Sequence, residues 1–127
     1  MMKVSAARIL VVDDELAMVE LLVSLLEEEG YEVSSAVTSD EGLKLFTLSR
    51  PDLVLLDIAL PGMSGIEMFR RIRSIDPTAR VVMVSGVADP VRAREALELG
   101  ALAYVDKPFD FAYLKRVVAM ALHDKPA

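Results

Sequence analysis

The chain has 127 residues, the size of one domain with room for a substantial hydrophobic core. Its formal net charge of −6 argues against direct nucleic-acid binding, and the absence of cysteine excludes disulfides and thiolate metal sites. No apolar run approaches the roughly 18–20 residues that span a membrane, and residues 1–8 lack the apolar centre of a secretory signal, so we expect a cytoplasmic domain with no membrane contact.

Strand-like and helix-like segments then alternate along the chain. The first strand is predicted over residues 8–13, and residues 15–29 follow with apolar side chains at helical spacing. The apolar face of this helix is expected to comprise Leu16, Val19, Leu22, Val23 and Leu26. Gly30 should end the helix, because glycine readily adopts the left-handed conformation of helix ends. A second strand is predicted over residues 31–36.

Capping boxes, in which a hydroxyl residue is followed three positions later by an acid, predict two more helices. The Thr38–Glu41 segment begins a helix that must finish before Pro51. The Ser64–Glu67 segment begins a helix that extends to about residue 75. A third strand over residues 52–57 lies between them.

The last third of the chain continues the alternation. A fourth strand is predicted over residues 80–85. Asp89–Pro90 then begins a helix, because aspartate caps helices and proline fits their first turn, and Gly100 should end it. A short fifth strand over residues 103–105 precedes a last helix that Asp110 caps.

The predicted strands are continuously apolar and do not alternate polar with apolar, which is typical of strands covered on both faces. With right-handed crossovers, this pattern predicts an α/β fold, a doubly wound five-stranded parallel sheet with five helices. We expect one domain over residues 8–123, an N-terminal extension over residues 1–7, and a tail or linker stub over residues 124–127.

Polar residues stand at the ends of four predicted strands. They are Asp13 and Asp14, Asp57, Ser85 and Lys107. Each alone has an ordinary structural interpretation, such as a helix cap or a solvated loop residue, but a cap does not explain two adjacent acids and a third at Asp57. Because ligands bind at the carboxyl edge of an open parallel sheet, these groups together suit a divalent cation and a transferable anionic group.

Four segments in order, VVDDE, LLDIALPGMSG, VMVSG and YVDKPF, resemble the receiver domain of bacterial two-component response regulators. The resemblance extends from Arg8 to about Leu122. It implies a flavodoxin-like strand order 2-1-3-4-5 and a signalling switch that phosphorylation activates.

The resemblance also assigns the acidic residues. It implies that Asp57 accepts a phosphoryl group from a histidine kinase, and that Asp13 and Asp14 hold Mg²⁺ together with Asp57 and the backbone carbonyl of Ala59. The chemistry is consistent, because a carboxylate and a phosphoryl group repel each other and Mg²⁺, which prefers oxygen ligands, offsets both charges.

The remaining implied site residues lie after the fourth strand and around the fifth. Ser85 takes the family's switch hydroxyl position and Tyr104 the position of its rotating aromatic. Lys107 takes the position of a lysine that acts as a point charge on a phosphoryl oxygen. The Lys107–Pro108 peptide bond is expected to be cis.

Such a switch changes a protein-binding face when it is phosphorylated. The expected partners are a sensor histidine kinase or phosphotransfer protein, an output domain or target protein, and a second copy bound through the last two helices and the fifth strand. Candidate contact residues on this face include Arg92, Glu95, Lys115 and Arg116.

One alternative is a phosphotransferase or phosphatase with an aspartyl-phosphate intermediate, as in haloacid-dehalogenase-like enzymes. That family has an Asp-x-Asp pattern after its first strand and a cap domain, whereas Asp13–Asp14 lacks the pattern and the chain is too short for a cap. A degenerate receiver that acts as a constitutive interaction module is a further alternative, but all the expected site side chains are present. We therefore expect a domain that is not an enzyme towards other substrates and catalyses only its own phosphorylation and slow dephosphorylation.

The slow dephosphorylation is predicted from two departures from the fast-cycling chemotaxis regulators. Where those carry asparagine and glutamate, this chain has Ala59 and Val87. Neither side chain has a donor or acceptor that would orient an attacking water. The alternative is that both residues simply pack at the rim of the pocket.

Overall fold

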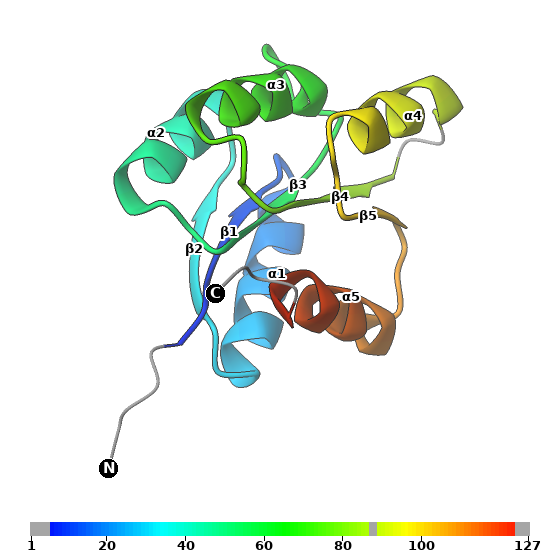
Figure 1. Cartoon of the computed structure of the whole chain (residues 1–127). Coiled ribbons are helices and arrows are strands. Elements are labelled where there is room, and N and C mark those ends of the chain that lie inside the picture. Colours follow the sequence, from blue (N-terminus) through cyan, green and yellow to red (C-terminus); the bar gives the residue numbers. More distant parts are fainter. Residues whose placement is uncertain (1–5, 87–88, 124–127) are drawn as a thin grey trace.

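In the computed structural model, which describes residues 6–86 and 89–123, a parallel sheet lies between two layers of helices (Figure 1). The elements are β1 (Arg8–Val12), α1 (Leu16–Glu28), β2 (Glu32–Ala36), α2 (Ser39–Ser49), β3 (Leu53–Leu56), α3 (Gly65–Ile75), β4 (Val81–Ser85), α4 (Pro90–Glu98), β5 (Ala103–Asp106) and α5 (Phe111–His123). The strand order is β2-β1-β3-β4-β5, and every pair is parallel. The predicted doubly wound fold and the flavodoxin-like order are therefore confirmed.

Each face of the sheet has its own hydrophobic core, because successive side chains of a strand point to opposite faces. Leu10 and Val12 of β1 belong to one core and Ile9 and Val11 to the other. Helices α2, α3 and α4 cover the first face, and α1 and α5 cover the second (Figure 1). The central strands are thus buried on both sides, as their continuous apolar character predicts.

Strand β2 departs from that apolar character. Its Ser34 and Ser35 are only half-buried. The strand lies at an edge of the sheet and pairs with β1 alone, so its side chains are less enclosed than those of β3 or β4. Continuous apolar character is therefore a property of the inner strands.

The helix ends follow the capping signals. The Thr38 and Ser64 hydroxyls each accept a hydrogen bond at 3.2 Å from the backbone N–H three residues later. The Asp89 carboxylate accepts from two backbone N–H groups at the start of α4. Gly30 and Gly100, which follow α1 and α4, have φ angles of 93° and 95°, the left-handed region that favours glycine.

The buried face of α1 is narrower than its predicted apolar face. Val19, Leu22 and Leu26 are buried and Val23 is half-buried, but Leu16 is 61% exposed. Side chains of a helix point back towards its N-terminus, so the side chain of this first residue extends past the end of the helix. Leu16 therefore belongs to the apolar face of α1 by its spacing but is not part of the buried core.

One arginine joins three elements on the α3–α4 face. The Arg73 guanidinium on α3 donates hydrogen bonds to the backbone carbonyls of Leu99 at 2.8 Å and Gly100 at 3.3 Å, just after α4. It also donates to the carbonyl of Ala79 at 2.5 Å, just before β4. The end of α4 is therefore anchored to α3 and to the start of β4.

The described elements begin at Arg8 and end at His123, and the domain limits of residues 8–123 stay a prediction. The expected tail over residues 124–127 and residues 1–5 of the expected N-terminal extension lie outside the described residues. Within the described part of the chain, none of the helices is long and apolar enough to cross a membrane.

Gly65, the first residue of α3, lies against the backbone that carries Asp57. A Cβ atom at this position would lie 2.0 Å from the carbonyl oxygen of Asp57 and 2.7 Å from the Cα of Ile58. These are backbone atoms, which cannot move aside by changing rotamer. We predict that Gly65→Ala lowers the free energy of unfolding by about 2–3 kcal/mol, the usual cost of overpacking, as measured by urea denaturation.

Gly86→Ala is the matched control for this prediction. Its added Cβ would make only ordinary contacts, the nearest at 3.7 Å from the Cβ of Lys107. We expect it to change the free energy of unfolding by less than about 0.5 kcal/mol. Equal stability of the two variants would contradict the close approach at Gly65.

Candidate functional site

The carboxyl ends of β1 and β3 lie side by side because these two strands are neighbours. Val12 pairs with Leu56, and the Asp57 N–H donates a hydrogen bond to the Val12 carbonyl at 3.0 Å. The residues after the two strands therefore emerge at the same level. One carboxylate oxygen from each of Asp13, Asp14 and Asp57 lies within 4.8 Å of the others.

This carboxylate cluster is closed on one side and open on the other. Asp13 and Asp57 are only 2% and 5% exposed, whereas Asp14 is exposed. Its donors are all hard oxygens, the type that Mg²⁺ prefers, and the open side leaves room for the waters that this ion usually keeps. The residues present therefore fit a magnesium ion.

Lys107 extends into the cluster from the loop after β5. Its Nζ lies 2.5 Å from an Asp13 oxygen, 3.5 Å from an Asp57 oxygen and 3.4 Å from an oxygen of Glu15. The lysine side chain is only 9% exposed, so its charge is poorly screened by water. No role for Glu15 was predicted, and its only signal in the sequence is its place directly after the acidic pair.

The pocket shifts the ionisation of two of these groups. Burial raises the pKa of Asp57, and the negative charge of Asp13 raises it further. The positive charge of Lys107 and a hydrogen bond at 3.2 Å from the Ala59 N–H act in the opposite direction, but burial outweighs them. Burial acts to lower the pKa of Lys107, but the hydrogen bond to Asp13 and the charges of Asp57 and Asp13 outweigh it and raise that pKa. The pocket therefore favours the charged form of Lys107 and disfavours the charged form of Asp57.

The predicted switch residues are already in contact. Ser85 is fully buried at the end of β4, and a hydrogen bond joins its hydroxyl to that of Tyr104 on the neighbouring strand β5. Tyr104 is half-buried, and burial raises the pKa of its hydroxyl while the hydrogen bond with Ser85 lowers it. The Lys107 N–H also donates to the Ser85 carbonyl at 2.8 Å.

Three further sequence expectations concern the loops around the cluster. Ala59 is exposed in the loop after β3, next to the Asp57 carboxylate. The Lys107–Pro108 peptide bond is cis, which confirms the expectation. Val87, the other position expected to slow dephosphorylation, lies outside the described residues.

The four expected partner-contact residues each have a partner within the domain. Glu95 pairs with Arg70 of α3 at 2.7 Å, and Lys115 pairs with an acid at the end of α1 at 3.2 Å. Arg92 interacts with the cap of its own helix, and Arg116 lies over an aromatic ring of α5. Two of the four charges therefore join helices within the domain.

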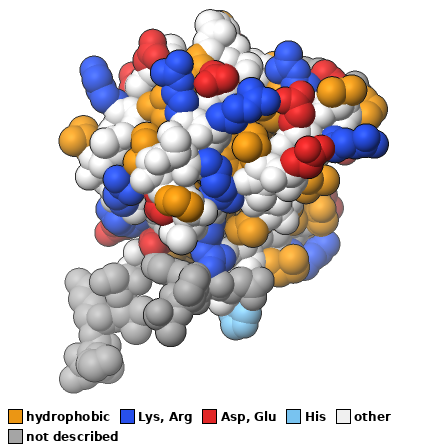
Figure 2. Space-filling view, turned by 45° about the horizontal axis from the view of Figure 1, so that its top comes forward, with side chains coloured by type: hydrophobic (Ala, Val, Ile, Leu, Met, Phe, Trp, Pro, Cys, Tyr) orange, Lys and Arg blue, Asp and Glu red, His pale blue; other side chains and the backbone are white. Residues whose placement is uncertain are grey.

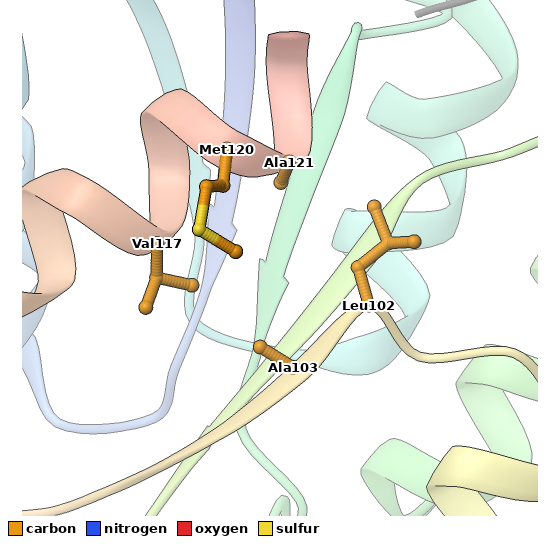
Figure 3. Close-up of a pocket in the computed structure, with 5 residues that line it drawn as sticks. All are labelled: Leu102, Ala103, Val117, Met120 and Ala121. Carbon is orange, nitrogen blue, oxygen red and sulfur yellow. The ribbon is translucent and has the colours of Figure 1, made fainter. Parts of the chain in front are cut away.

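A small apolar pocket lies at the opposite end of β5 from Lys107 (Figure 3). It is lined by Leu102, Ala103, Val117, Met120 and Ala121. None of these side chains is titratable or nucleophilic, so the pocket adds no chemistry to the carboxylate cluster. Leu102 and Met120 are 48% and 68% exposed, which gives the β5–α5 face an apolar surface.

Acidic and basic side chains are mixed on the face of the molecule seen in Figure 2. Figure 2 shows acidic and basic side chains interspersed on the visible face, with apolar side chains scattered among them. The single-sign basic stripe that typically binds nucleic acid is not visible on the part of this face that the described residues form.

Comparison with known proteins identifies the family to which this arrangement belongs. The model of the response regulator receiver domain matches residues 9–119. The chain belongs to the response regulator receiver domain family. It is 39% identical over 111 residues to the sporulation initiation phosphotransferase F of Bacillus subtilis (strain 168), and this match covers 87% of the chain and 90% of that protein.

Solved structures of receiver domains have the same fold. A CheY-like response regulator receiver domain protein from Methanospirillum hungatei JF-1 has a TM-score of 0.91 at 36% identity, with 94% of this chain and 96% of that chain covered. The response regulator TrrA from Thermotoga maritima, in complex with Mg²⁺ and BeF, has a TM-score of 0.84 at 40% identity, with 91% and 99% covered.

Some relatives are longer than this receiver domain. The chain spans 45% of the transcriptional regulatory protein CseB from Streptomyces coelicolor and 25% of the regulatory protein AtoC from Escherichia coli. Receiver domains are phosphorylation-activated signalling switches that bind Mg²⁺ at an acidic pocket and interact with histidine kinases or phosphotransfer proteins and with output domains. The alternative of an enzyme with an aspartyl-phosphate intermediate is not favoured.

The raised pKa of Asp57 makes the ionised side chain a cost to the folded state. We predict that Asp57→Asn raises the free energy of unfolding at pH 7, without metal, by roughly 1–2 kcal/mol. Because burial raises the folded-state pKa of Asp57 above its ordinary value of 3.8, the wild type should lose stability relative to the variant as pH rises from that value through the folded-state pKa. Urea denaturation in EDTA across this range measures both effects.

The same variant should respond less to magnesium. A cation that binds only the folded cluster stabilises it by mass action, so Mg²⁺ should raise the wild-type melting temperature more than that of Asp57→Asn. Asp106→Asn, at the exposed last position of β5, is the control and should behave like the wild type. Identical stability and Mg²⁺ response of wild type and Asp57→Asn would contradict the acidic pocket.

Proposed function

We propose that Asp57 accepts a phosphoryl group from a phosphohistidine on a sensor histidine kinase or phosphotransfer protein. An Asp57 oxygen forms a bond to phosphorus while the donor's phosphorus–nitrogen bond breaks and its electron pair stays on the imidazole. The observation that carries this proposal is the convergence of Asp13, Asp14, Asp57 and Lys107 at one edge of the sheet.

We propose that Asp13, Asp14, Asp57 and the backbone carbonyl of Ala59 hold Mg²⁺ for this reaction. When bound, the ion would offset the negative charges of the carboxylate and the phosphoryl group. The buried side of the cluster fixes the direction of the Asp57 carboxylate, while the exposed Asp14 leaves the opposite side accessible to the donor.

Lys107 and Ser85 would contact the phosphoryl oxygens. The Lys107 Nζ is already 3.5 Å from Asp57, and an ammonium there offers a point charge to a new anion. The Ser85 hydroxyl has one proton, so donating it to a phosphoryl oxygen changes its hydrogen bond with Tyr104. We propose that Tyr104 then changes its packing and carries the signal to the α4–β5–α5 face.

We propose that this face binds an output domain, a target protein or a second copy of the domain. The exposed Leu102 and Met120 beside the apolar pocket support an apolar contact there (Figure 3). The receiver domain in this proposal extends over residues 8–123, acts in the cytoplasm, and catalyses only its own phosphorylation and slow dephosphorylation.

The acceptor is tested by labelling with a small phosphodonor in the presence of Mg²⁺. Asp57→Asn should reduce labelling at least about a hundredfold, because an amide is a far weaker nucleophile than a carboxylate. Asp106→Asn, which changes an exposed aspartate outside the cluster, should be labelled like the wild type. Undiminished labelling of Asp57→Asn would refute the assignment of the acceptor.

The lifetime of the phosphoryl group tests the slow dephosphorylation. The double variant Ala59→Asn, Val87→Glu should lose its label about tenfold faster than the wild type, because both new side chains can orient an attacking water. A control with Ala59→Leu and Val87→Met has side chains of similar size without strong donors or acceptors, and it should decay at the wild-type rate. Equal decay of the two double variants would instead support simple packing at the rim.

A further inference from the structure

Lys107 has one carboxylate partner that the proposed function does not use. Its Nζ contacts Asp13, Asp57 and Glu15, and only the first two belong to the cluster that would hold Mg²⁺. Among the described residues, the acids whose oxygens lie within 4.8 Å of one another are Asp13, Asp14 and Asp57, without Glu15. Glu15 is therefore a partner of the lysine and not a member of the carboxylate cluster.

The geometry of Glu15 also departs from the usual role of its position. It is the N-cap residue of α1, with φ −86° and ψ 105°, but its side chain accepts no capping hydrogen bond. The Glu15 N–H donates to the other Asp13 oxygen at 3.0 Å, which fixes the loop so that both side chains face Lys107. The carboxylate is thus directed at the lysine and not at the helix end.

The Asp13 carboxylate cannot bind the Lys107 ammonium and Mg²⁺ equally well at the same time. Its carboxylate accepts the short hydrogen bond from Lys107 and is also one of the three oxygen donors that fit Mg²⁺. A divalent ion beside Asp13 would repel the ammonium, and that repulsion is strong because the Lys107 side chain is only 9% exposed. Lys107 then needs another anion within reach if it is to stay beside Asp57.

We propose that Glu15 is a positioning residue whose carboxylate pairs with the Lys107 ammonium when Mg²⁺ binds Asp13. This inference rests on the proposed Mg²⁺-dependent function. A Glu15 oxygen lies 3.4 Å from the lysine Nζ, and the Glu15 side chain is 65% exposed. Water screens this ion pair, so the lysine can leave it readily. The lysine remains beside Asp57 and moves to the phosphoryl oxygen when that group arrives. Glu15 thereby removes part of the competition between Lys107 and Mg²⁺ for Asp13.

The test is the affinity for Mg²⁺ alone, measured by isothermal titration calorimetry on the whole chain. Glu15→Gln should weaken Mg²⁺ binding about threefold to fivefold, the size that an exposed ion pair allows. Glu20→Gln removes the same charge from an exposed position on α1, and it should leave Mg²⁺ affinity within about 1.5-fold of wild type. An equal effect of the two variants would overturn the role of Glu15.

A double-mutant cycle distinguishes an effect through the Glu15–Lys107 contact from a direct effect of the Glu15 charge on Mg²⁺. If Glu15 acts through the lysine, Glu15→Gln should have an effect of less than about 1.5-fold on Mg²⁺ affinity in a Lys107→Met background. The same loss in both backgrounds would show that Glu15 acts on the ion by charge alone and would overturn the proposal. Urea denaturation establishes that each variant is folded at the temperature of the titration.

Glu15→Asp tests the Glu15–Lys107 contact independently if Lys107→Met does not fold. It keeps the charge but shortens the side chain by one methylene, so the contact interpretation predicts most of the loss seen with Glu15→Gln, and wild-type affinity would overturn it. If the wild type itself bound no Mg²⁺, the proposed function would fail together with this inference. If the wild type binds Mg²⁺ and the Glu15 variants match it, only the role of Glu15 fails.

Discussion

One ammonium shared among carboxylates holds the carboxyl edge of this sheet together. Asp13 and Asp57 are almost completely buried, where two negative charges a few ångströms apart repel each other more strongly than in water. The Lys107 side chain lies between them and offsets part of that repulsion. Because Lys107 and Asp13 are 94 positions apart in the chain, the pair can form only after the sheet has brought β1, β3 and β5 into register.

The sequence predicts those parts of the fold that local physics decides. Apolar runs, capping boxes at Thr38 and Ser64, and glycines after helices all identify elements that the structure contains. The positions of Asp13 and Asp57 at strand ends are also predictable, because neighbouring parallel strands end at one edge.

The contacts that depend on side-chain direction were not predictable in the same way. Leu16 fits the apolar periodicity of α1, but the periodicity does not show that a first-turn side chain extends past the helix. Glu15 reads as an ordinary acid near a helix start, and only the approach of Lys107 from a distant loop gives it a partner. Arg73 likewise shows no sequence signal, because its acceptors are three backbone carbonyls.

The charged and apolar parts of the α4–β5–α5 face have different uses within the domain. Glu95 and Lys115 are engaged with α3 and the end of α1, so a partner that paired with them would first have to replace those contacts. The apolar side chains of Leu102 and Met120 remain at the surface. If partners bind the proposed face, apolar burial would therefore contribute more to recognition than the charges that the sequence suggested.

The anchoring of α4 by Arg73 limits the ways in which that helix can move. Three hydrogen bonds join the Arg73 guanidinium to the end of α4 and the start of β4, and a translation of the whole helix would stretch the bonds to Leu99 and Gly100 together. A disturbance that began near Ser85, as proposed, would reach α4 at its other end, the Asp89–Pro90 start. A tilt about the Leu99–Gly100 end would keep these hydrogen bonds, and it would displace the first turn of α4 most.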